Sequence, residues 1–177
     1  MRVRGQDFRS IWQADAGGYV AVIDQTLLPF AFEVRTLRCV EDAATAIRDM
    51  VVRGAPLIGV TTAYGVALAL REHPGDGSLA AAIEQLVATR PTAVNLRWAA
   101  ERMRRTVATL PPAERAARAY SEAAAIAEED VASCAAIGRH GLGLLRELAR
   151  GRGGERINVL THCNAGWLAC VDWGTAL

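Results

Sequence analysis

Cys163 has the clearest potential for chemistry, because an apolar and β-branched run delivers it into a glycine-containing bend within INVLTHCNAG, residues 157–166. We expect a strand over residues 157–160, and open α/β sheets bind their ligands at the carboxyl ends of their strands. The amides of a helix beginning after Asn164 would stabilise a thiolate, the form of cysteine that acts as base or nucleophile. The alternative is a small buried core cysteine, because free cysteine is among the most buried residue types.

The other cysteines and the neighbouring histidine are expected to be structural. Adjacent residues on a strand point to opposite faces, so His162 is not positioned to pair with Cys163. The four cysteines of the chain show no CxxC or zinc-finger spacing. We therefore expect Cys39, Cys134 and Cys170 to be core residues.

Two turns combine an arginine with the start of a helix. RGAP, residues 53–56, offers a guanidinium, a glycine that permits close approach, and free amides at a helix N-terminus, which together suit a phosphate. RPT, residues 90–92, repeats this arrangement around Arg90. The alternative for each turn alone is an ordinary helix link with a surface arginine. The phosphate-site interpretation therefore requires the two turns and Cys163 to converge.

The composition narrows the possible chemistry. All 20 basic residues are arginine, which excludes Schiff-base aldolases, pyridoxal-phosphate enzymes and Walker-type loops, since each needs a lysine. Asp24, in IDQTLLP, is either a catalytic acid or a turn former, because an aspartate after a strand commonly forms a turn.

The chain carries no signal for a nucleic-acid or membrane partner. The formal net charge is +1, with both signs mixed along the chain, so no basic surface for DNA, RNA or an anionic membrane is expected. The longest apolar stretch, residues 57–70, is shorter than the ~20 residues that a bilayer crossing requires. Because the N-terminus lacks an apolar targeting core, we expect a cytoplasmic protein.

The hydrophobic pattern divides the chain into three regions. A small N-terminal sheet region covers residues 1–40, with antiparallel strands expected over 19–23 and 32–39. A helical domain covers residues 41–154. Its helices are expected over 41–53, 56–70, 79–88, 93–110, 113–132 and 134–149. Residues 155–177 contain the strand at 157–160 and begin a further domain, so the expected fold class is α+β passing to α/β.

Four strings occur in the order and spacing typical of one family: IDQTLLP, VVRGAPLIGVTTAYGVALAL, RPTAVNLRWAAERM and LTHCNAG. Over nearly all of its length, the chain resembles the methylthioribose-1-phosphate isomerases, which are related to ribose-1,5-bisphosphate isomerases and to regulatory subunits of a translation-initiation exchange factor. The resemblance implies an aldose–ketose isomerase that converts methylthioribose-1-phosphate to methylthioribulose-1-phosphate in methionine salvage. It also implies a homodimer, a phosphosugar substrate, no metal or organic cofactor, and a Rossmann-like C-terminal domain, here truncated after its first strand.

The resemblance also assigns roles to particular residues. Arg53, Gly54, Ala55 and Arg90 match residues that bind the sugar phosphate, and Cys163 matches a proposed catalytic residue. The second acid–base group of the family is an aspartate further along the Rossmann-like domain. We therefore expect this chain to be inactive by itself, to bury its surface poorly, and to aggregate or need a partner. The alternatives are a ribose-1,5-bisphosphate-type phosphosugar isomerase and a non-catalytic regulatory subunit of the same fold.

Overall fold

The computed structural model describes residues 1–14, 17–153 and 155–176. A short hairpin joins β1 (Arg2–Val3) to β2 (Gln6–Asp7), and a separate antiparallel sheet holds β3 (Ile11–Gln13), β4 (Val20–Ile23) and β5 (Val34–Leu37) in that order. The predicted antiparallel pair is confirmed as β4 and β5, whose register sets Val20 opposite Leu37. The hairpin and β3 were missed, because strands of two or three residues leave almost no alternating pattern.

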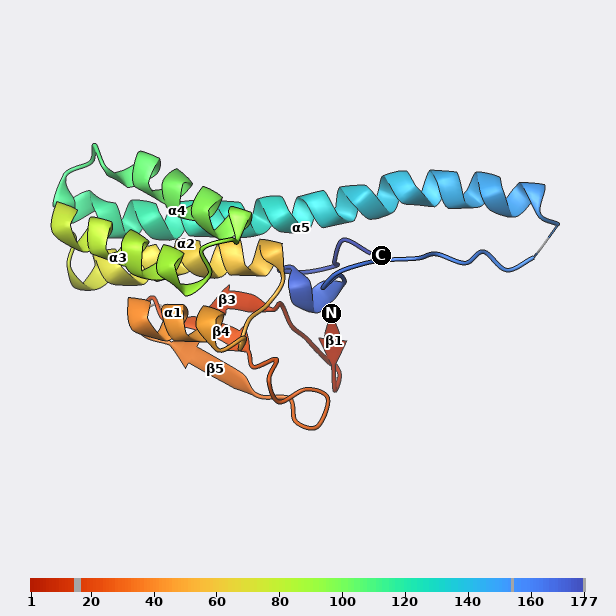
Figure 1. Ribbon diagram of the computed structural model, residues 1–177, viewed down its shortest axis with the longest axis horizontal. Helices are drawn as coiled ribbons and strands as arrows, with labels where there is room; N and C mark the ends of the chain where they lie inside the picture. Colours follow the sequence, from red (N-terminus) through yellow and green to blue (C-terminus); the bar gives the residue numbers. More distant parts are fainter. Residues whose placement is uncertain (15–16, 154, 177) are drawn as a thin grey trace.

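A bundle of helices lies against this sheet (Figure 1). Its members are α1 (Val40–Arg48), α2 (Ala55–Glu72), α3 (Asp76–Thr89), α4 (Val94–Val107) and the first part of α5 (Pro112–Gly151). α2 is central, and all of its residues from Leu57 to Leu70 are buried because the other four helices surround it. Small residues permit this packing: a Cβ added to Gly65 would lie 3.0 Å from Cβ of Ala43 in α1.

Two helix predictions were wrong at their boundaries. The helices expected over 113–132 and 134–149 are one continuous helix, α5, because Ser133 alone does not interrupt a helix that no proline or left-handed residue breaks. The helix expected over 41–53 ends at Arg48, since Asp49 caps it and Met50 adopts a positive φ of 60°.

The second part of α5 projects as an arm beyond the bundle (Figure 1). The buried residues of α5 end at Cys134, whereas Leu144 is 65% exposed. The chain then returns toward the bundle and reaches η1 (Trp167–Ala169), a single 3-10 turn.

The strand predicted over 157–160 is not formed in the described part of the chain. Residues 157–160 belong to no sheet, and Leu160 is 97% exposed. A strand requires a neighbour to pair its backbone groups, and among the described residues this segment has none. Small antiparallel sheets followed by a helical domain confirm the α+β class, whereas the boundaries at 40 and 154 stay a prediction. Within the described ranges, no helix combines the length and apolar character needed to span a membrane.

Candidate active site

Gly54 sets the geometry of the RGAP turn. It is the N-cap of α2 and adopts φ 101°, a conformation that residues with a side chain rarely take. A Cβ at this position would lie 2.4 Å from Cα of Ala169 and 2.6 Å from the carbonyl oxygen of Ala169. The turn therefore packs directly against η1, which begins four residues after Cys163. Arg53 and Ala55, on either side of Gly54, are exposed.

A cavity of about 270 Å³ opens at the N-terminal end of α2. Pro56 and Gly59 of α2 form one wall, and α4 and α5 form the others. The lining from these two helices consists of Asn95, Trp98, Ile126, Glu129, Asp130 and Ser133. The cavity thus combines a helix N-terminus, which favours anions, with carboxylates that accept hydrogen bonds from hydroxyl groups.

The two carboxylates in this wall differ in their environments. Glu129 accepts hydrogen bonds from both Nη atoms of Arg102, at 2.5 and 2.7 Å, and these bonds hold its pKa below its usual value. Burial raises the pKa of Asp130, and a hydrogen bond from the backbone N–H of Val171 opposes that rise. Asp130 is therefore the carboxyl group of this wall that holds a proton more readily than an exposed aspartate.

The RPT turn lies on the other side of the N-terminal end of α4. Arg90 is the C-cap of α3 and is half-buried, and its carbonyl oxygen accepts a hydrogen bond of 3.0 Å from the backbone N–H of Ala93. Pro91, Thr92 and Arg97 line a second cavity of about 360 Å³. Trp98 lines both cavities, so the RGAP and RPT turns flank one aromatic side chain.

Arg53 and Arg90 have free guanidinium groups. Among the described ranges 1–14, 17–153 and 155–176, neither forms an ion pair or a side-chain hydrogen bond. By contrast, Arg115 donates hydrogen bonds to three carbonyl oxygens and forms an ion pair with Asp76, so its guanidinium group stabilises the fold. An anion at Arg53 or Arg90 would displace no existing partner.

Cys163 is exposed and lies at a bend with φ 70°. The alternative of a buried core cysteine is therefore wrong for Cys163. A positive φ in a residue with a side chain is strained by roughly 1–3 kcal/mol, and such strain concentrates at functional sites. The helix expected after Asn164 is only the three-residue η1, which is too short to provide the dipole of a full helix. His162 is exposed as well.

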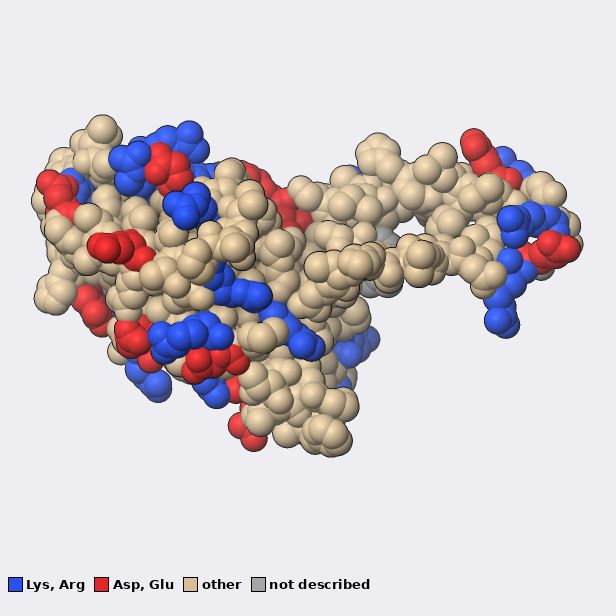
Figure 2. Space-filling model, in the orientation of Figure 1, with Lys and Arg blue, Asp and Glu red and all other residues tan. Residues whose placement is uncertain are grey.

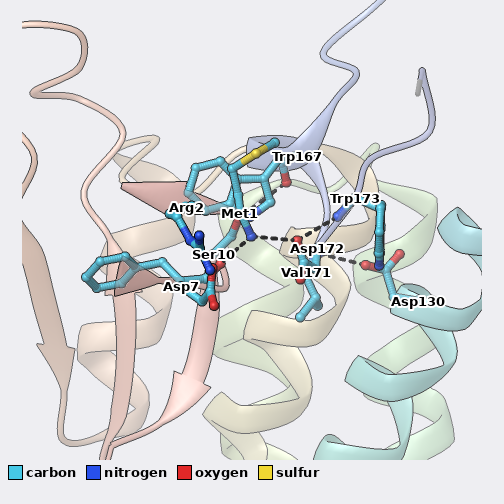
Figure 3. A network of polar contacts seen from close by, with 10 residues as sticks. Met1, Arg2, Asp7, Ser10, Asp130, Trp167, Val171, Asp172 and Trp173 are labelled. Atoms are coloured by element: carbon cyan, nitrogen blue, oxygen red, sulfur yellow. Dashed lines mark hydrogen bonds and ion pairs between the residues drawn. The ribbon is translucent and has the colours of Figure 1, made fainter. Parts of the chain in front are cut away.

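The segment after Cys163, residues 167–172, is fastened to the body from several sides and is called the anchor segment below (Figure 3). Ser10 donates its backbone N–H to the carbonyl oxygen of Val171 at 2.9 Å, and the backbone N–H of Val171 donates to Asp130 Oδ2 at 2.7 Å. The terminal amine of Met1 donates to Asp172 Oδ1 at 3.1 Å. These bonds hold the anchor segment between the N-terminal region, α2 and α5.

The IDQTLLP motif also contributes to this anchoring. Asp24 is 2% exposed, and its carboxylate accepts hydrogen bonds from the N–H and hydroxyl of Thr26 and an ion pair from Arg35. The turn-former interpretation of Asp24 accounts for the contacts with Thr26, and the ion pair with Arg35 joins this turn to β5. Its neighbour Gln25 donates a hydrogen bond of 2.6 Å from Nε2 to the carbonyl oxygen of Leu168. This contact was not predicted from the sequence.

The structure places parts of the predicted motifs near one another, but among the described residues neither Arg53 nor Arg90 lines the two cavities, so the convergence of Arg53, Arg90 and Cys163 stays a prediction. The RGAP turn and the anchor segment are in direct contact, and the RGAP and RPT turns lie at neighbouring cavities. Cys163 lines neither of these two cavities among the described residues. The core assignments of Cys134 and Cys170 are confirmed, and Cys39 is half-buried.

A family model, the initiation factor 2 subunit family, matches residues 51–171. The chain belongs to this family. Over all 177 residues it is 60% identical to the methylthioribose-1-phosphate isomerase of Methylorubrum populi, of which the match covers 48%. The chain thus spans about half the length of the curated relatives it matches. The resemblance to methylthioribose-1-phosphate isomerases is confirmed.

Two solved structures of the family share this fold. The 5-methylthioribose 1-phosphate isomerase of Pyrococcus horikoshii matches with a TM-score of 0.81 and 37% identity, over 96% of this chain and 47% of that one. The delta subunit of translation initiation factor eIF-2B from A. fulgidus matches with a TM-score of 0.78 and 40% identity, over 95% of this chain and 48% of that one. The fold is thus common to an enzyme and to an initiation-factor subunit.

Proposed function

We propose that residues 1–177 form the N-terminal part of a cytoplasmic methylthioribose-1-phosphate isomerase, which makes methylthioribulose-1-phosphate in methionine salvage. The observation that carries this proposal is the 60% identity, along the whole chain, to a protein of that name. Fold similarity alone does not separate an enzyme from a regulatory subunit, because the TM-scores of 0.81 and 0.78 are close. The complete enzyme is proposed to act as a homodimer.

In the proposed site, the substrate phosphate binds between Arg53 and Arg90. The free amides at the start of α2 add hydrogen bonds, and Gly54 and Ala55 leave the backbone accessible. Both guanidinium groups lack ion-pair partners within the described residues, which supports a role in binding an external anion. Glu129 of the cavity wall would accept hydrogen bonds from the sugar hydroxyls.

The reaction needs an acid–base pair as well as a phosphate anchor. One hydrogen moves from C2 to C1 of the sugar, the bond from C1 to the ring oxygen breaks, and C2 becomes a ketone. The C2 hydroxyl loses its proton and the former ring oxygen gains one, so the reaction requires no external oxidant. Cys163 is proposed as one member of the pair, and the second is the aspartate that the resemblance places beyond residue 177. We therefore expect residues 1–177 alone to give no turnover.

A chimera tests this proposal directly. Residues 1–177 replace the matching 48% of the Methylorubrum populi isomerase, and turnover of methylthioribose-1-phosphate is measured. We expect activity within about tenfold of the parent enzyme. We expect Cys163→Ala to reduce kcat by about 10²–10⁴-fold, the usual contribution of one acid–base group. We expect Arg53→Gln to act mainly on KM, since it removes a phosphate contact.

The control in the same chimera is Cys39→Ala, which removes a half-buried thiol in front of α1 and should leave kcat and KM unchanged. A chimera whose Cys163→Ala variant keeps full activity would contradict the proposed role of Cys163. Size-exclusion chromatography with light scattering measures the proposed dimer on the same preparation.

The similarity to an initiation-factor subunit supports a second candidate function, that of a non-catalytic regulatory subunit. A folded chimera that turns over neither methylthioribose-1-phosphate nor ribose-1,5-bisphosphate would favour it. Preference for ribose-1,5-bisphosphate would instead indicate the related phosphosugar isomerase.

A further inference from the structure

Three potential metal ligands meet where α5 contacts the anchor segment. Asp130 and Cys134 lie one turn apart on α5, and Cys170 directly follows η1. One ligand atom from each residue lies within 4.8 Å of the other two, and both cysteines are buried. Aspartate and cysteine at i and i+4 share one face of a helix, so the two α5 ligands point toward the same partner.

The spacing of these atoms is close to that of a tetrahedral site. Zinc–sulfur and zinc–oxygen bonds of about 2.3 and 2.0 Å place neighbouring ligand atoms about 3.3–3.8 Å apart. Metal binding would draw the three ligand atoms together from their separation of up to 4.8 Å by rotation of their side chains. The N–H of Val171 already holds Asp130 Oδ2, at 2.7 Å, and orients the carboxylate in the way that supporting hydrogen bonds orient metal ligands.

Burial disfavours the charged forms of all three groups, and a bound cation would offset that cost. Burial raises the pKa of Cys134, of Asp130, and of Cys170, the last to about 12. Among the described residues, Asp130 has no ion-pair partner. A divalent metal ion displaces the thiol protons and compensates the resulting negative charge, which removes the penalty of burying these groups.

Two cavities beside the cluster offer a path for the ion and a source of a fourth ligand. Cys134 lines a cavity of about 430 Å³ together with Leu142 and Trp173, and Asp130 lines the cavity of about 270 Å³ at the start of α2. The cluster thus separates two spaces that admit water. A water molecule from either side completes a four-coordinate site.

We propose that Asp130, Cys134 and Cys170 bind one thiophilic divalent cation of the zinc class, which fixes the anchor segment to α5. The role is structural: the ion cross-links two elements and does not contact the proposed phosphosugar. A reversible disulfide is the competing use of two neighbouring cysteines. The observations favour the metal, because the Asp130 carboxylate lies within 4.8 Å of both sulfur atoms as a third ligand, and a disulfide would leave that carboxylate without a role.

Cobalt titration tests this site on the chain as it stands. Reduced protein freed of metal by a chelator is titrated with Co²⁺, and thiolate-to-cobalt charge-transfer absorption is recorded. We expect one equivalent of cobalt, two protons released for each metal bound, and displacement of the cobalt by Zn²⁺. We expect Cys134→Ser, Cys170→Ser and Asp130→Asn each to weaken binding by about 100-fold or more.

Matched controls distinguish this site from adventitious thiol binding. Cys39→Ser and Cys163→Ser remove the other two thiols and should leave the titration unchanged. Circular dichroism of each variant checks that its helix content equals that of the parent chain.

Three results would overturn the proposal. They are the absence of charge-transfer absorption in the reduced parent chain, binding that persists in the Cys134→Ser/Cys170→Ser double variant, and a Cys134–Cys170 disulfide in protein prepared without an oxidant. The titration needs no substrate, so its result is independent of the proposed isomerase activity.

Discussion

The sequence motif and the structure give two different explanations for the glycine at position 54. In the sequence, the glycine of RGAP indicates a place where a phosphate approaches the backbone closely. In the structure, the atoms next to Gly54 belong to Ala169, at a distance that leaves no space for a side chain. The close approach of a phosphate stays a prediction, whereas the group that the structure shows beside Gly54 is the protein's own backbone. Sequence spacing did not identify this partner, because Ala169 is far from Gly54 along the chain.

Gly54→Ala is therefore expected to destabilise the chain by about 2–4 kcal/mol, from strain at φ 101° together with the clash against Ala169. Urea unfolding followed by circular dichroism measures the change. The matched control is Gly77→Ala in α3, where nothing lies within 4 Å of an added Cβ. That control should stabilise the chain by about 0.5–1 kcal/mol, since alanine is the better helix former. Equal effects of the two substitutions would contradict the packing described for Gly54.

At the scale of the elements, the sequence predicted best where periodicity runs over many residues. α2 follows the expected range closely, because a buried run from Leu57 to Leu70 begins directly after Pro56. The prediction of a strand over residues 157–160 was wrong. Its residues have the composition of a strand, but strand formation depends on a neighbour that local sequence does not contain.

The junction of α4 and α5 depends on one arginine. Arg102 of α4 donates to Glu122 at 2.7 Å and to both oxygens of Glu129 on α5, and Glu122 is only 7% exposed. We expect Arg102→Gln to lower the free energy of unfolding at neutral pH by about 1.5–3 kcal/mol, the usual contribution of hydrogen bonds between charged groups. The control Arg104→Gln, on the exposed face of α4, removes a pair with Glu101 and should change stability very little.

The same substitution predicts a dependence on pH. The bonds from Arg102 lower the pKa of Glu129 in the folded state from its ordinary value of 4.5. A lowered folded-state pKa gives stability that is complete above the unfolded value and is lost as the pH falls through the folded value. The difference in stability between the parent chain and Arg102→Gln should therefore shrink below about pH 4.5. A difference that stays constant into the acid range would exclude the ion pair as its source.

At the scale of the whole molecule, the arm leaves apolar surface uncovered. Figure 2 shows uncharged residues along the arm between the charged residues at its tip and those on the bundle. Leu144 and Leu148 of the arm are 65% and 52% exposed, and Leu160, in the segment that returns from the arm, is 97% exposed. The sequence predicted poor burial for the chain as a whole, because only the first strand of the expected C-terminal sheet lies within it, and it did not predict where the uncovered surface would be.

We expect this surface to drive self-association of the chain. Light scattering should show an apparent mass that rises with concentration, and Leu144→Glu, Leu148→Lys and Leu160→Ser together should abolish that rise. The control is Phe30→Ser, which removes an apolar side chain that is 96% exposed but lies outside the arm. Association that persists in the triple variant would place the contact elsewhere.

The candidate site shows where sequence reasoning was least effective. Arginine turns and an exposed cysteine are visible as motifs, so their positions were predicted. The cluster of Asp130, Cys134 and Cys170 is not visible in this way, because it has no metal-finger spacing and forms only where α5 meets a distant segment. The contacts of Ser10 and Gln25 with the anchor segment have the same origin. Residues that meet only through tertiary packing have no signature in a single sequence.

The continuity of α5 has a mechanical consequence. From Cys134 to Gly151 the helix advances about 26 Å, at 1.5 Å per residue, with no joint along the way. A tilt of this segment by about 10° at Cys134 would therefore move its far end by about 4.5 Å. The rigidity with which α5 is held near Cys134 therefore determines the position of its C-terminal end and of the backbone that leads from that end to Cys163.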